Sequence, residues 1–294
     1  MSLSPEQMQA RSTGVGGSEV AAILGICPYR QPYDVWLEKT GRAGPVDLSG
    51  NESVFWGVEY EEPIAREYMR RKDVKVRRKN QTARHPKYDW LVANIDRDIV
   101  GVRKGLEIKN IGWRLAHLWG ESGTDQAAEY YIPQPHHYML VMDYEAWDLA
   151  AVIGGQELRV YEFERDPEMD EIIIDATHDF WHNNVLADVP PEIDYNHKHT
   201  ASLLKRIYKS VEGDPVELDE SAARWAAVFL ESKELASKYE KAAEVAKFHL
   251  QSLVGNHPAG ILPDGSGFTR KIVKRSGFTV EPVEYVDFRY KKSL

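Results

Sequence analysis

The chain alternates between segments with the apolar periodicity of strands and segments with that of helices. Five segments have the apolar, β-branched composition of strands: 74–84, 90–98, 105–111, 147–153 and 158–164. Apolar residues recur at helical spacing in five others: 19–24, 32–41, 55–72, 126–142 and 168–186. The Gly154-Gly155 pair separates the last two strands and predicts a hairpin. The pattern therefore predicts an α/β (α+β) fold in which a mixed β-sheet is flanked by helices.

The first predicted helix follows a glycine-rich loop and has a candidate cap. Ser18 is a favourable N-cap residue, and Gly25 ends the helix. Helix N-termini expose unpaired N–H groups that bind phosphate, and Arg11 lies seven residues before Ser18, where it could supply a countercharge. Gly-Gly-Ser loops are also common caps without any ligand. In the third helix, Pro63 fits only in a first turn, or else it kinks the helix.

The character of the chain changes after Pro190-Pro191. Residues 216–254 form a long helical pattern rich in Ala, Glu and Lys, and the tail around Phe268 and Phe278 alternates as a β-hairpin does. We therefore expect a core over residues 1–195 and a C-terminal extension over 196–294, made of a long helix and a β-hairpin. The function of the extension is open: it is a docking module for a partner or a helical arm packed on the core.

Composition excludes several classes of protein. Of the 294 residues, 43% are apolar and 28% are charged, as in soluble globular proteins, and no apolar run has the length of a membrane span. The N-terminus lacks the features of a signal peptide. Cys27 is the single cysteine, which excludes an intramolecular disulfide and a four-cysteine metal site. A Walker-type phosphate loop is absent. We expect a protein of the reducing cytoplasm, with no membrane partner.

Charge is distributed unevenly along the sequence. The net charge is −9, yet residues 66–115 contain 15 Lys and Arg against 6 Asp and Glu. A local basic field favours binding to a phosphate backbone. A solvated helix end and an exposed strand are the more common meaning of such a run. The same stretch contains the candidate catalytic acids, and this favours the functional interpretation.

Asp96, Glu107 and Lys109 carry the candidate chemistry. Residues two apart in a strand face the same side, so Glu107 and Lys109 share a face, and a hairpin would bring Asp96 opposite them. Two carboxylates can hold a hard divalent cation, and a nearby lysine can orient water and stabilise charge on a phosphate. A chain with 46 acidic residues contains several such strings by chance, most of them solvated strand edges. The spacing predicts metal-assisted phosphodiester hydrolysis if the three side chains converge.

Several motifs in order resemble the YqaJ-like viral recombinase family, relatives of phage lambda exonuclease in the PD-(D/E)XK nuclease superfamily. The matching pieces are Arg11–Gly25, Pro28–Gly41, Gly57–Glu61, Asp96 with Glu107–Lys109, and Ile132–Met139, and the stretch 165–191 also fits. The resemblance covers about residues 10 to 195. It implies a restriction-endonuclease-like core and an exonuclease in phage-type recombination.

The resemblance also implies residue roles. Asp96, Glu107 and the carbonyl of Ile108 bind the metals, with Glu61 as a further acid, and Lys109 orients or deprotonates the attacking water. Gln134 and Tyr138 lie on a helix that faces the site, and Arg11 and Ser18 hold a 5′-phosphate of DNA. The sequence departs from the family pattern at three places. Ile95 stands before Asp96 where the pattern has proline, which relaxed members allow. Glu62, next to Pro63, is an alternative to Glu61, and Pro135 is unusual inside the helix that carries Gln134.

The expected function is a Mg²⁺-dependent 5′-to-3′ exonuclease on linear double-stranded DNA, with Mn²⁺ as an alternative cofactor. The alternatives are a DNA endonuclease on the same core and a non-catalytic DNA-binding or recombination accessory protein. Expected partners are duplex DNA with free ends and a single-strand annealing protein. By resemblance we also expect a homotrimer, and a phage or prophage origin with action in the cytoplasm of a bacterial host.

Overall fold

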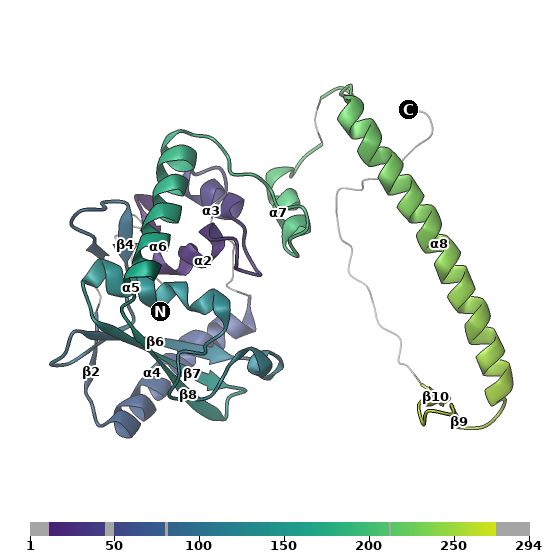
Figure 1. Cartoon of the computed structure of the whole chain (residues 1–294), viewed down its shortest axis with the longest axis horizontal. Coiled ribbons are helices and arrows are strands. Elements are labelled where there is room, and N and C mark those ends of the chain that lie inside the picture. Colours follow the sequence, from purple (N-terminus) through teal and green to yellow (C-terminus); the bar gives the residue numbers. More distant parts are fainter. Residues whose placement is uncertain (1–11, 45–49, 80–81, 212, 275–294) are drawn as a thin grey trace. The chain divides into compact units, whose positions relative to one another are not determined.

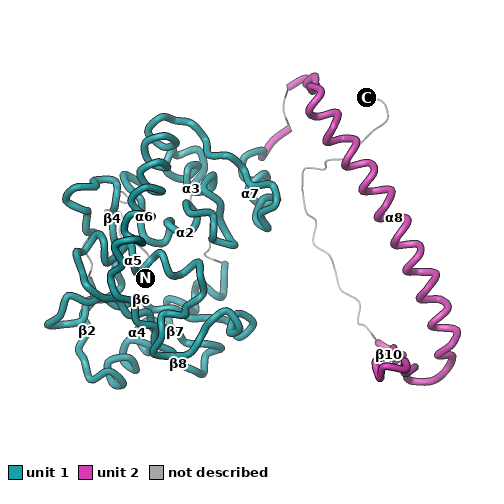
Figure 2. Tube along the Cα trace, viewed as in Figure 1, with its two compact units in different colours: residues 1–208 teal, residues 209–294 magenta. Residues whose placement is uncertain are grey.

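The computed structural model describes residues 12–44, 50–79, 82–211 and 213–274. The chain divides into two compact units, Met1–Tyr208 and Lys209–Leu294 (Figure 2). The first unit holds the sheet, the helices around it and the candidate catalytic residues.

The main sheet of the first unit has five strands in the order β2-β5-β6-β7-β8 (Figure 1). Their bounds are β2 Val76–Arg78, β5 Arg97–Ile99, β6 Lys104–Ile111, β7 Ala146–Ile153 and β8 Glu157–Glu164. β6 and β7 run parallel, and the other neighbouring pairs are antiparallel. The turn between β7 and β8 contains Gly154 and Gly155, both with positive φ, as that glycine pair predicts. The mixed sheet predicted from the sequence is confirmed.

A smaller sheet of three strands has the order β1-β4-β3. It consists of β1 Val15–Gly16, β4 Leu91–Ala93 and β3 Ala83–Arg84; β1 is parallel to β4, and β3 is antiparallel to it. Two predicted strands are therefore divided. The first half of 74–84 enters the main sheet and its end enters the small one, while 90–98 contributes β4 to the small sheet and β5 to the main sheet. Asp96 lies in the break between β4 and β5.

Helices cover both faces of the main sheet (Figure 1). α4 Glu52–Lys72 packs on β6 and β7 from one side, and α5 Pro133–Met142 packs on the same strands from the other. α2 Gly17–Ile23 and α6 Pro167–Asp179 pack against α5, and α3 Pro32–Lys39 packs against α2.

Some helical segments differ from the sequence prediction. Short 3₁₀ helices span Trp113–Leu118 and Glu129–Tyr131, so the helix predicted from residue 126 begins later. A π-helical turn, Phe180–Leu186, continues α6. Pro63 lies in the interior of α4, not in its first turn.

The core is divided between the two faces of the sheet. Leu106 and Ile108 of β6 pack with Tyr68 of α4 in one cluster. Leu149 of β7 and Met139 of α5 belong to the larger cluster on the other face. Both Leu106 and Leu149 are fully buried, and burial of one leucine side chain stabilises a fold by roughly 1.5–3 kcal/mol. The sheet that carries the candidate site is therefore held rigidly from both sides.

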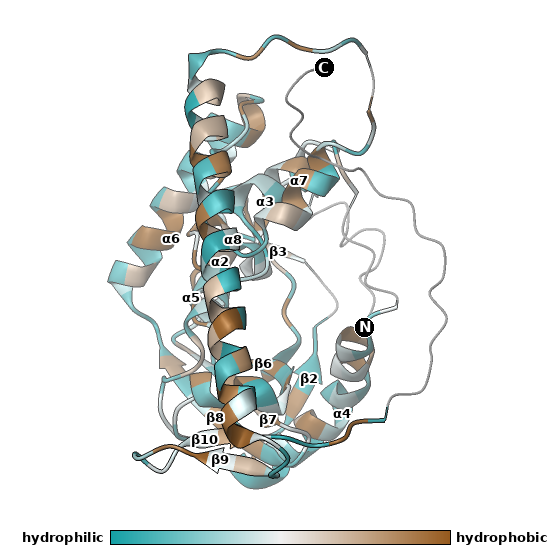
Figure 3. Cartoon of the chain, turned by 90° about the vertical axis from the view of Figure 1, so that its right-hand side faces the viewer, coloured by the Kyte–Doolittle hydropathy of each residue, from teal (hydrophilic) through white to brown (hydrophobic). Residues whose placement is uncertain are grey.

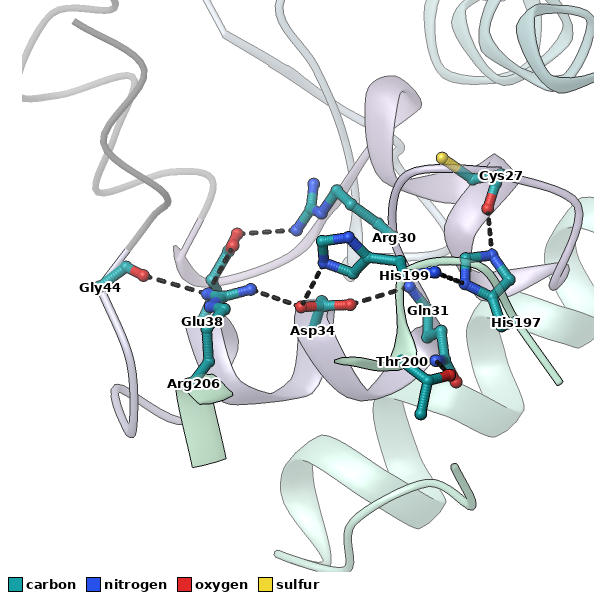
Figure 4. A network of polar contacts seen from close by, with 10 residues as sticks. All are labelled: Cys27, Arg30, Gln31, Asp34, Glu38, Gly44, His197, His199, Thr200 and Arg206. Carbon is teal, nitrogen blue, oxygen red and sulfur yellow. Dashed lines mark hydrogen bonds and ion pairs between the residues drawn. The ribbon is translucent and has the colours of Figure 1, made fainter. Parts of the chain in front are cut away.

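The last segment of the first unit is bound to α3 by polar contacts (Figure 4). Arg206 in α7, Thr200–Ile207, contacts the carboxylates of Asp34 and Glu38. Arg30 Nη2 donates to Glu38 Oε2 at 2.8 Å. These four charged side chains are called the α3–α7 ion network. Gln31 Nε2 also donates to Thr200 Oγ1 at 2.8 Å. Through these contacts the first unit extends to Tyr208, past the boundary expected at residue 195.

The second unit consists of a long helix and a short hairpin. α8 spans Glu220–Val254 over 35 residues, and the Asp219 side chain caps it by accepting from the Ala222 N–H. Apolar positions recur along α8 among polar ones (Figure 3), and large side chains such as Trp225 and Phe248 are exposed. Among the described residues, no helix has the length and apolar character needed to cross a membrane.

The C-terminal hairpin lies earlier in the chain than the sequence pattern predicts. β9 Ala259–Ile261 pairs in antiparallel fashion with β10 Gly267–Thr269. Phe268 is therefore in the second strand of the hairpin and not in its first. The turn uses the Pro263-Asp-Gly265 sequence, where Gly265 has a positive φ. Phe278 lies outside the described residues.

Candidate active site

The two faces of β6 differ in chemistry because successive side chains point to opposite sides. Leu106 and Ile108 enter the apolar cluster beneath α4. Glu107 and Lys109 lie on the other face, where the Lys109 ammonium contacts Glu107 Oε1. The prediction that the carboxylate and the ammonium share one face is confirmed.

Asp96 lies opposite Glu107. β5 and β6 are antiparallel with Arg97 paired to Leu106, so the residue before Arg97 faces the residue after Leu106. The N–H of Ile108 donates to Asp96 Oδ2 at 3.2 Å. The three side chains of Asp96, Glu107 and Lys109 therefore converge at one place on the sheet, as the hairpin geometry predicts.

Gln134 in α5 connects the site to the helix above it. Its Nε2 donates to Glu107 Oε1 at 2.8 Å and lies 2.9 Å from the Tyr138 hydroxyl. Pro135 does not disturb this arrangement, because α5 begins at Pro133 and Pro135 falls in the first turn. The N–H groups of a first turn have no partner within the helix, so a proline there costs no hydrogen bond.

A close approach of backbone fixes Tyr138. A Cβ atom added to Gly17 would lie 2.7 Å from Tyr138 Cε1, so only glycine fits at the start of α2. The Tyr138 ring also lies 5.1 Å from the Trp147 ring, measured between centroids. Tyr138 is held from two sides and in turn limits where Gln134 can lie.

The site contains more acids than its own cation balances. Glu107 is buried and Asp96 is half-buried, and Lys109 is the cation between them. Burial, and then the neighbouring Glu107 carboxylate, raise the pKa of Asp96 well above its ordinary value. Burial works to lower the pKa of Lys109, but the charges of Glu107 and Asp96 outweigh it and raise the pKa.

Glu107 also has an oxygen without a partner. Among the described residues, none donates a hydrogen bond to the buried Glu107 Oε2. A buried carboxylate oxygen in that state costs free energy unless a cation or water occupies its lone pairs. The excess charge and this oxygen fit a hard divalent cation held by Asp96 and Glu107. Within the described segments, no group of three His, Cys, Asp or Glu side chains is arranged to bind a metal, so other ligands would be backbone carbonyls or water.

Arg97 contacts both candidate acids of α4, Glu61 and Glu62. Its Nη2 lies 3.4 Å from Glu61 Oε1 and 3.0 Å from Glu62 Oε2. Glu62 also accepts from Arg78 at 2.8 Å, and its side chain is 50% exposed, against 15% for Glu61. Of these two acids on α4, Glu61 is the one whose charge adds to that of Glu107 in raising the pKa of Asp96. Glu61 therefore lies nearer to the site, but its carboxylate faces an arginine.

Two further residues of the site, Arg97 and Tyr131, were not predicted from the sequence. Arg97 follows Asp96 directly, and its buried position was not marked by any motif. The Tyr131 ring lies with its centroid 5.4 Å from Lys109 Nζ, in a cation–π contact. Tyr131 could have been suspected, because it lies three residues before Gln134, next to a matching motif.

Comparisons with known proteins identify the family of this chain. The family model described as a YqaJ-like viral recombinase domain matches residues 6–145. A Bacillus subtilis (strain 168) protein described as uncharacterised protein YqaJ is 32% identical over 241 residues, which cover 81% of this chain and 74% of that protein. The chain belongs to the YqaJ-like viral recombinase family.

Solved structures agree on the fold of this family member. An alkaline exonuclease from Laribacter hongkongensis matches with a TM-score of 0.51 and 19% identity, over 68% of this chain and 100% of that one. The same exonuclease in complex with dAMP matches with a TM-score of 0.51 and 20% identity over the same shares. The restriction-endonuclease-like core expected from the sequence is confirmed.

The predicted phosphate-binding pair is only half described. Arg11 lies outside the described residues. Ser18 is exposed at the second position of α2 and is not the N-cap. The cap is Gly16, whose N–H donates to Glu19 Oε2 at 2.8 Å. The prediction of Ser18 as the cap is wrong, because α2 begins at Gly17 and its cap, Gly16, is held through its own backbone N–H by the buried Glu19 carboxylate.

Much of the basic stretch is paired with acids. Lys72 contacts Glu162, and Arg77 and Lys79 lie 3.5 Å and 3.4 Å from Asp98 Oδ2. The Lys72–Glu162 pair is partly exposed and contributes little stability, whereas the Asp98 carboxylate is buried between its partners. Lys72 can therefore exchange its acidic partner for a phosphate at less cost than Arg77 or Lys79.

Proposed function

We propose that this protein is a metal-dependent exonuclease that degrades linear double-stranded DNA from a 5′ end. The observation that carries the proposal is the convergence of Asp96, Glu107 and Lys109, with the buried Glu107 Oε2 lacking a partner among the described residues. A structural ion pair needs no surplus carboxylate, whereas a cation site does. The exonuclease from Laribacter hongkongensis has the same fold, and its complex with dAMP supports a nucleotide product.

The roles of the residues follow from their contacts. Asp96 and Glu107 would hold Mg²⁺, with Mn²⁺ as an alternative and the Ile108 carbonyl as a further ligand. A bound Mg²⁺ supplies a water of lowered pKa and neutralises charge on the phosphate. Lys109 has three N–H donors, and it places a positive charge beside the phosphate and orients the attacking water. Gln134 fixes the Glu107 carboxylate through Oε1, which leaves Oε2 free for the cation.

The other predicted residues act around this centre. We assign Glu61 a supporting role, because its charge reaches Asp96 while Arg97 holds its carboxylate. Arg11 and Ser18 would bind the 5′-phosphate that each cleavage leaves. Tyr138 would keep Gln134 in place through its hydroxyl. We further propose that it acts in phage-type recombination, with a single-strand annealing partner and a trimeric assembly.

The test uses end-labelled linear duplexes with a 5′-phosphate or a 5′-hydroxyl, and covalently closed circular DNA, each with Mg²⁺ or EDTA. We expect mononucleotide release from the linear duplexes in Mg²⁺ alone, faster with the 5′-phosphate, and an intact circle. Asp96→Asn should lower the rate at least about a hundredfold, with an unchanged circular dichroism spectrum.

Other outcomes decide against the proposal. Cleavage of the closed circle indicates an endonuclease on the same core. Binding of DNA without products in any divalent cation indicates an accessory protein. Retained activity in Asp96→Asn removes the assigned site.

A further inference from the structure

Three tyrosine rings form a continuous row from the candidate site to the surface. The Tyr131 centroid lies 5.4 Å from Lys109 Nζ, and the Tyr130 centroid lies 4.6 Å from that of Tyr131. The Tyr29 ring follows with its centroid 5.8 Å from Tyr130, at an interplanar angle of 87°. Tyr130 and Tyr131 are half-buried, whereas Tyr29 is 51% exposed. We call these three residues the tyrosine row.

Rigid elements hold the inner end of the row. Tyr130 and Tyr131 belong to the 3₁₀ helix that directly precedes α5, the helix that carries Gln134. The Trp119 ring backs Tyr131 at 5.3 Å between centroids. Tyr29 comes from the loop between α2 and α3, far away in the sequence. The row is thus assembled from separate segments and stays fixed relative to Lys109.

Packing explains the inner rings but not the outer one. Tyr131 is covered by Trp119, Tyr130 and Lys109, so its ring fills space in the fold. Tyr29 keeps half of its surface in water, and its edge contact with Tyr130 leaves ring surface uncovered. The Pro28-Tyr29 dipeptide belongs to a stretch that matches the family, and the proposed reaction uses neither residue.

We propose that the tyrosine row is a nucleobase-binding wall that stacks with a base next to the phosphate held at Lys109. The proposal rests on the nuclease function above, which places a phosphate at this lysine. The adjoining nucleoside must then lie close to the rings, because the row begins at the same ammonium. Every base has a π-face, so stacking on tyrosine is tolerant of sequence, as degradation of arbitrary DNA requires.

The experiment measures binding, not cleavage. A duplex labelled at its far end is titrated with protein in Ca²⁺, and fluorescence anisotropy gives Kd; gels verify that the DNA stays intact. A second duplex is identical but abasic at the two nucleotides that flank the first cleavable phosphate. We expect wild type to bind the complete duplex about tenfold more tightly than the abasic one, the effect of about one stacked base.

Variants at Tyr29 separate stacking from a structural role. Tyr29→Ala should bind both duplexes with the weaker Kd, because the wall has lost its exposed ring. Tyr29→Phe keeps the ring and should behave as wild type. The proposal is overturned if Tyr29→Ala weakens binding equally on both duplexes, if it changes nothing, or if wild type does not distinguish the duplexes.

The two proposals fail in different ways. A protein that cleaves linear DNA in Mg²⁺ but binds both duplexes equally keeps the exonuclease function and loses the wall. A protein that distinguishes the duplexes but never cleaves keeps the wall and loses the exonuclease function.

Discussion

Two clusters in the first unit each combine buried acids with cations, and they differ in how completely the charges are satisfied. In the α3–α7 ion network, Asp34 and Glu38 face Arg30 and Arg206, so the charges balance (Figure 4). Asp34 Oδ2 accepts from the Gln31 N–H at 3.0 Å, and its Oδ1 faces Arg206. Both Glu38 oxygens also have arginine partners.

In the cluster of Asp96, Glu107 and Lys109, the acids outnumber the cations. Asp96 and Glu107 share the single cation of Lys109, and Glu107 Oε2 accepts no hydrogen bond from the described part of the chain. A balanced network contributes to the fold, whereas a surplus carboxylate costs stability until something binds it. Between these two clusters, the surplus acid and the unpartnered Glu107 Oε2, more than the presence of acids, distinguish the candidate site from the ion network.

The largest effect on stability should come from breaking the balanced network. Arg206→Met keeps much of the apolar stem but leaves the fully buried Asp34 with less cationic partnership. We expect the free energy of unfolding to fall by about 3 kcal/mol, because an uncompensated buried charge is costly. Urea denaturation measures this change. DNA cleavage per folded molecule should stay at the wild-type rate, and a loss of cleavage in the folded variant contradicts the separation of the two clusters.

The opposite sign is expected at the unbalanced cluster. In EDTA at about pH 9, where Asp96 is ionised, Glu107→Gln removes the repulsion between the two carboxylates, so it should raise the free energy of unfolding by about 1 kcal/mol. The matched change Glu38→Gln in the balanced network should lower it. Thermal unfolding in EDTA compares the two. The account is contradicted if both variants are destabilised to the same extent.

A further effect is expected in the pH dependence of stability. The pKa of Asp96 is raised to about 8 by burial and by Glu107, from an ordinary value of 3.8. The unfolded chain releases this proton at a lower pH than the folded chain, so stability falls as pH rises from about 4 towards 8. In EDTA we expect wild type to lose stability more steeply with pH than Asp96→Asn across this interval, by up to about 1.4 kcal/mol per pH unit, the slope of one bound proton. Parallel urea-derived pH profiles for the two proteins would exclude the assigned shift.

The local geometry of the site was predictable from the sequence. The period of two along β6 places Glu107 and Lys109 on one face, and the antiparallel pairing brings Asp96 to them. The face on which a strand side chain lies follows from local alternation and can be predicted without knowing distant contacts. The turn between β7 and β8 was predictable for the same reason, because the adjacent glycines Gly154 and Gly155 mark it locally.

Contacts between distant segments were not predictable in this way. Arg206 reaches Asp34 across 172 positions in the sequence, and nothing in the composition near residue 200 marks this contact. The cap of α2 moved from Ser18 to Gly16 because a buried carboxylate, Glu19, satisfies the N–H group. Pro135 does not interrupt the hydrogen bonds of α5, because the helix begins later than the apolar period indicates and Pro135 lies in its first turn.

The most direct test of the central claim is to locate Mn²⁺ in crystals of the protein by anomalous diffraction. The account predicts an anomalous peak bound by carboxylate oxygens of both Asp96 and Glu107, and no such peak in crystals of Asp96→Asn. A fully occupied Mn²⁺ elsewhere, with water or nothing between Asp96 and Glu107, would contradict it.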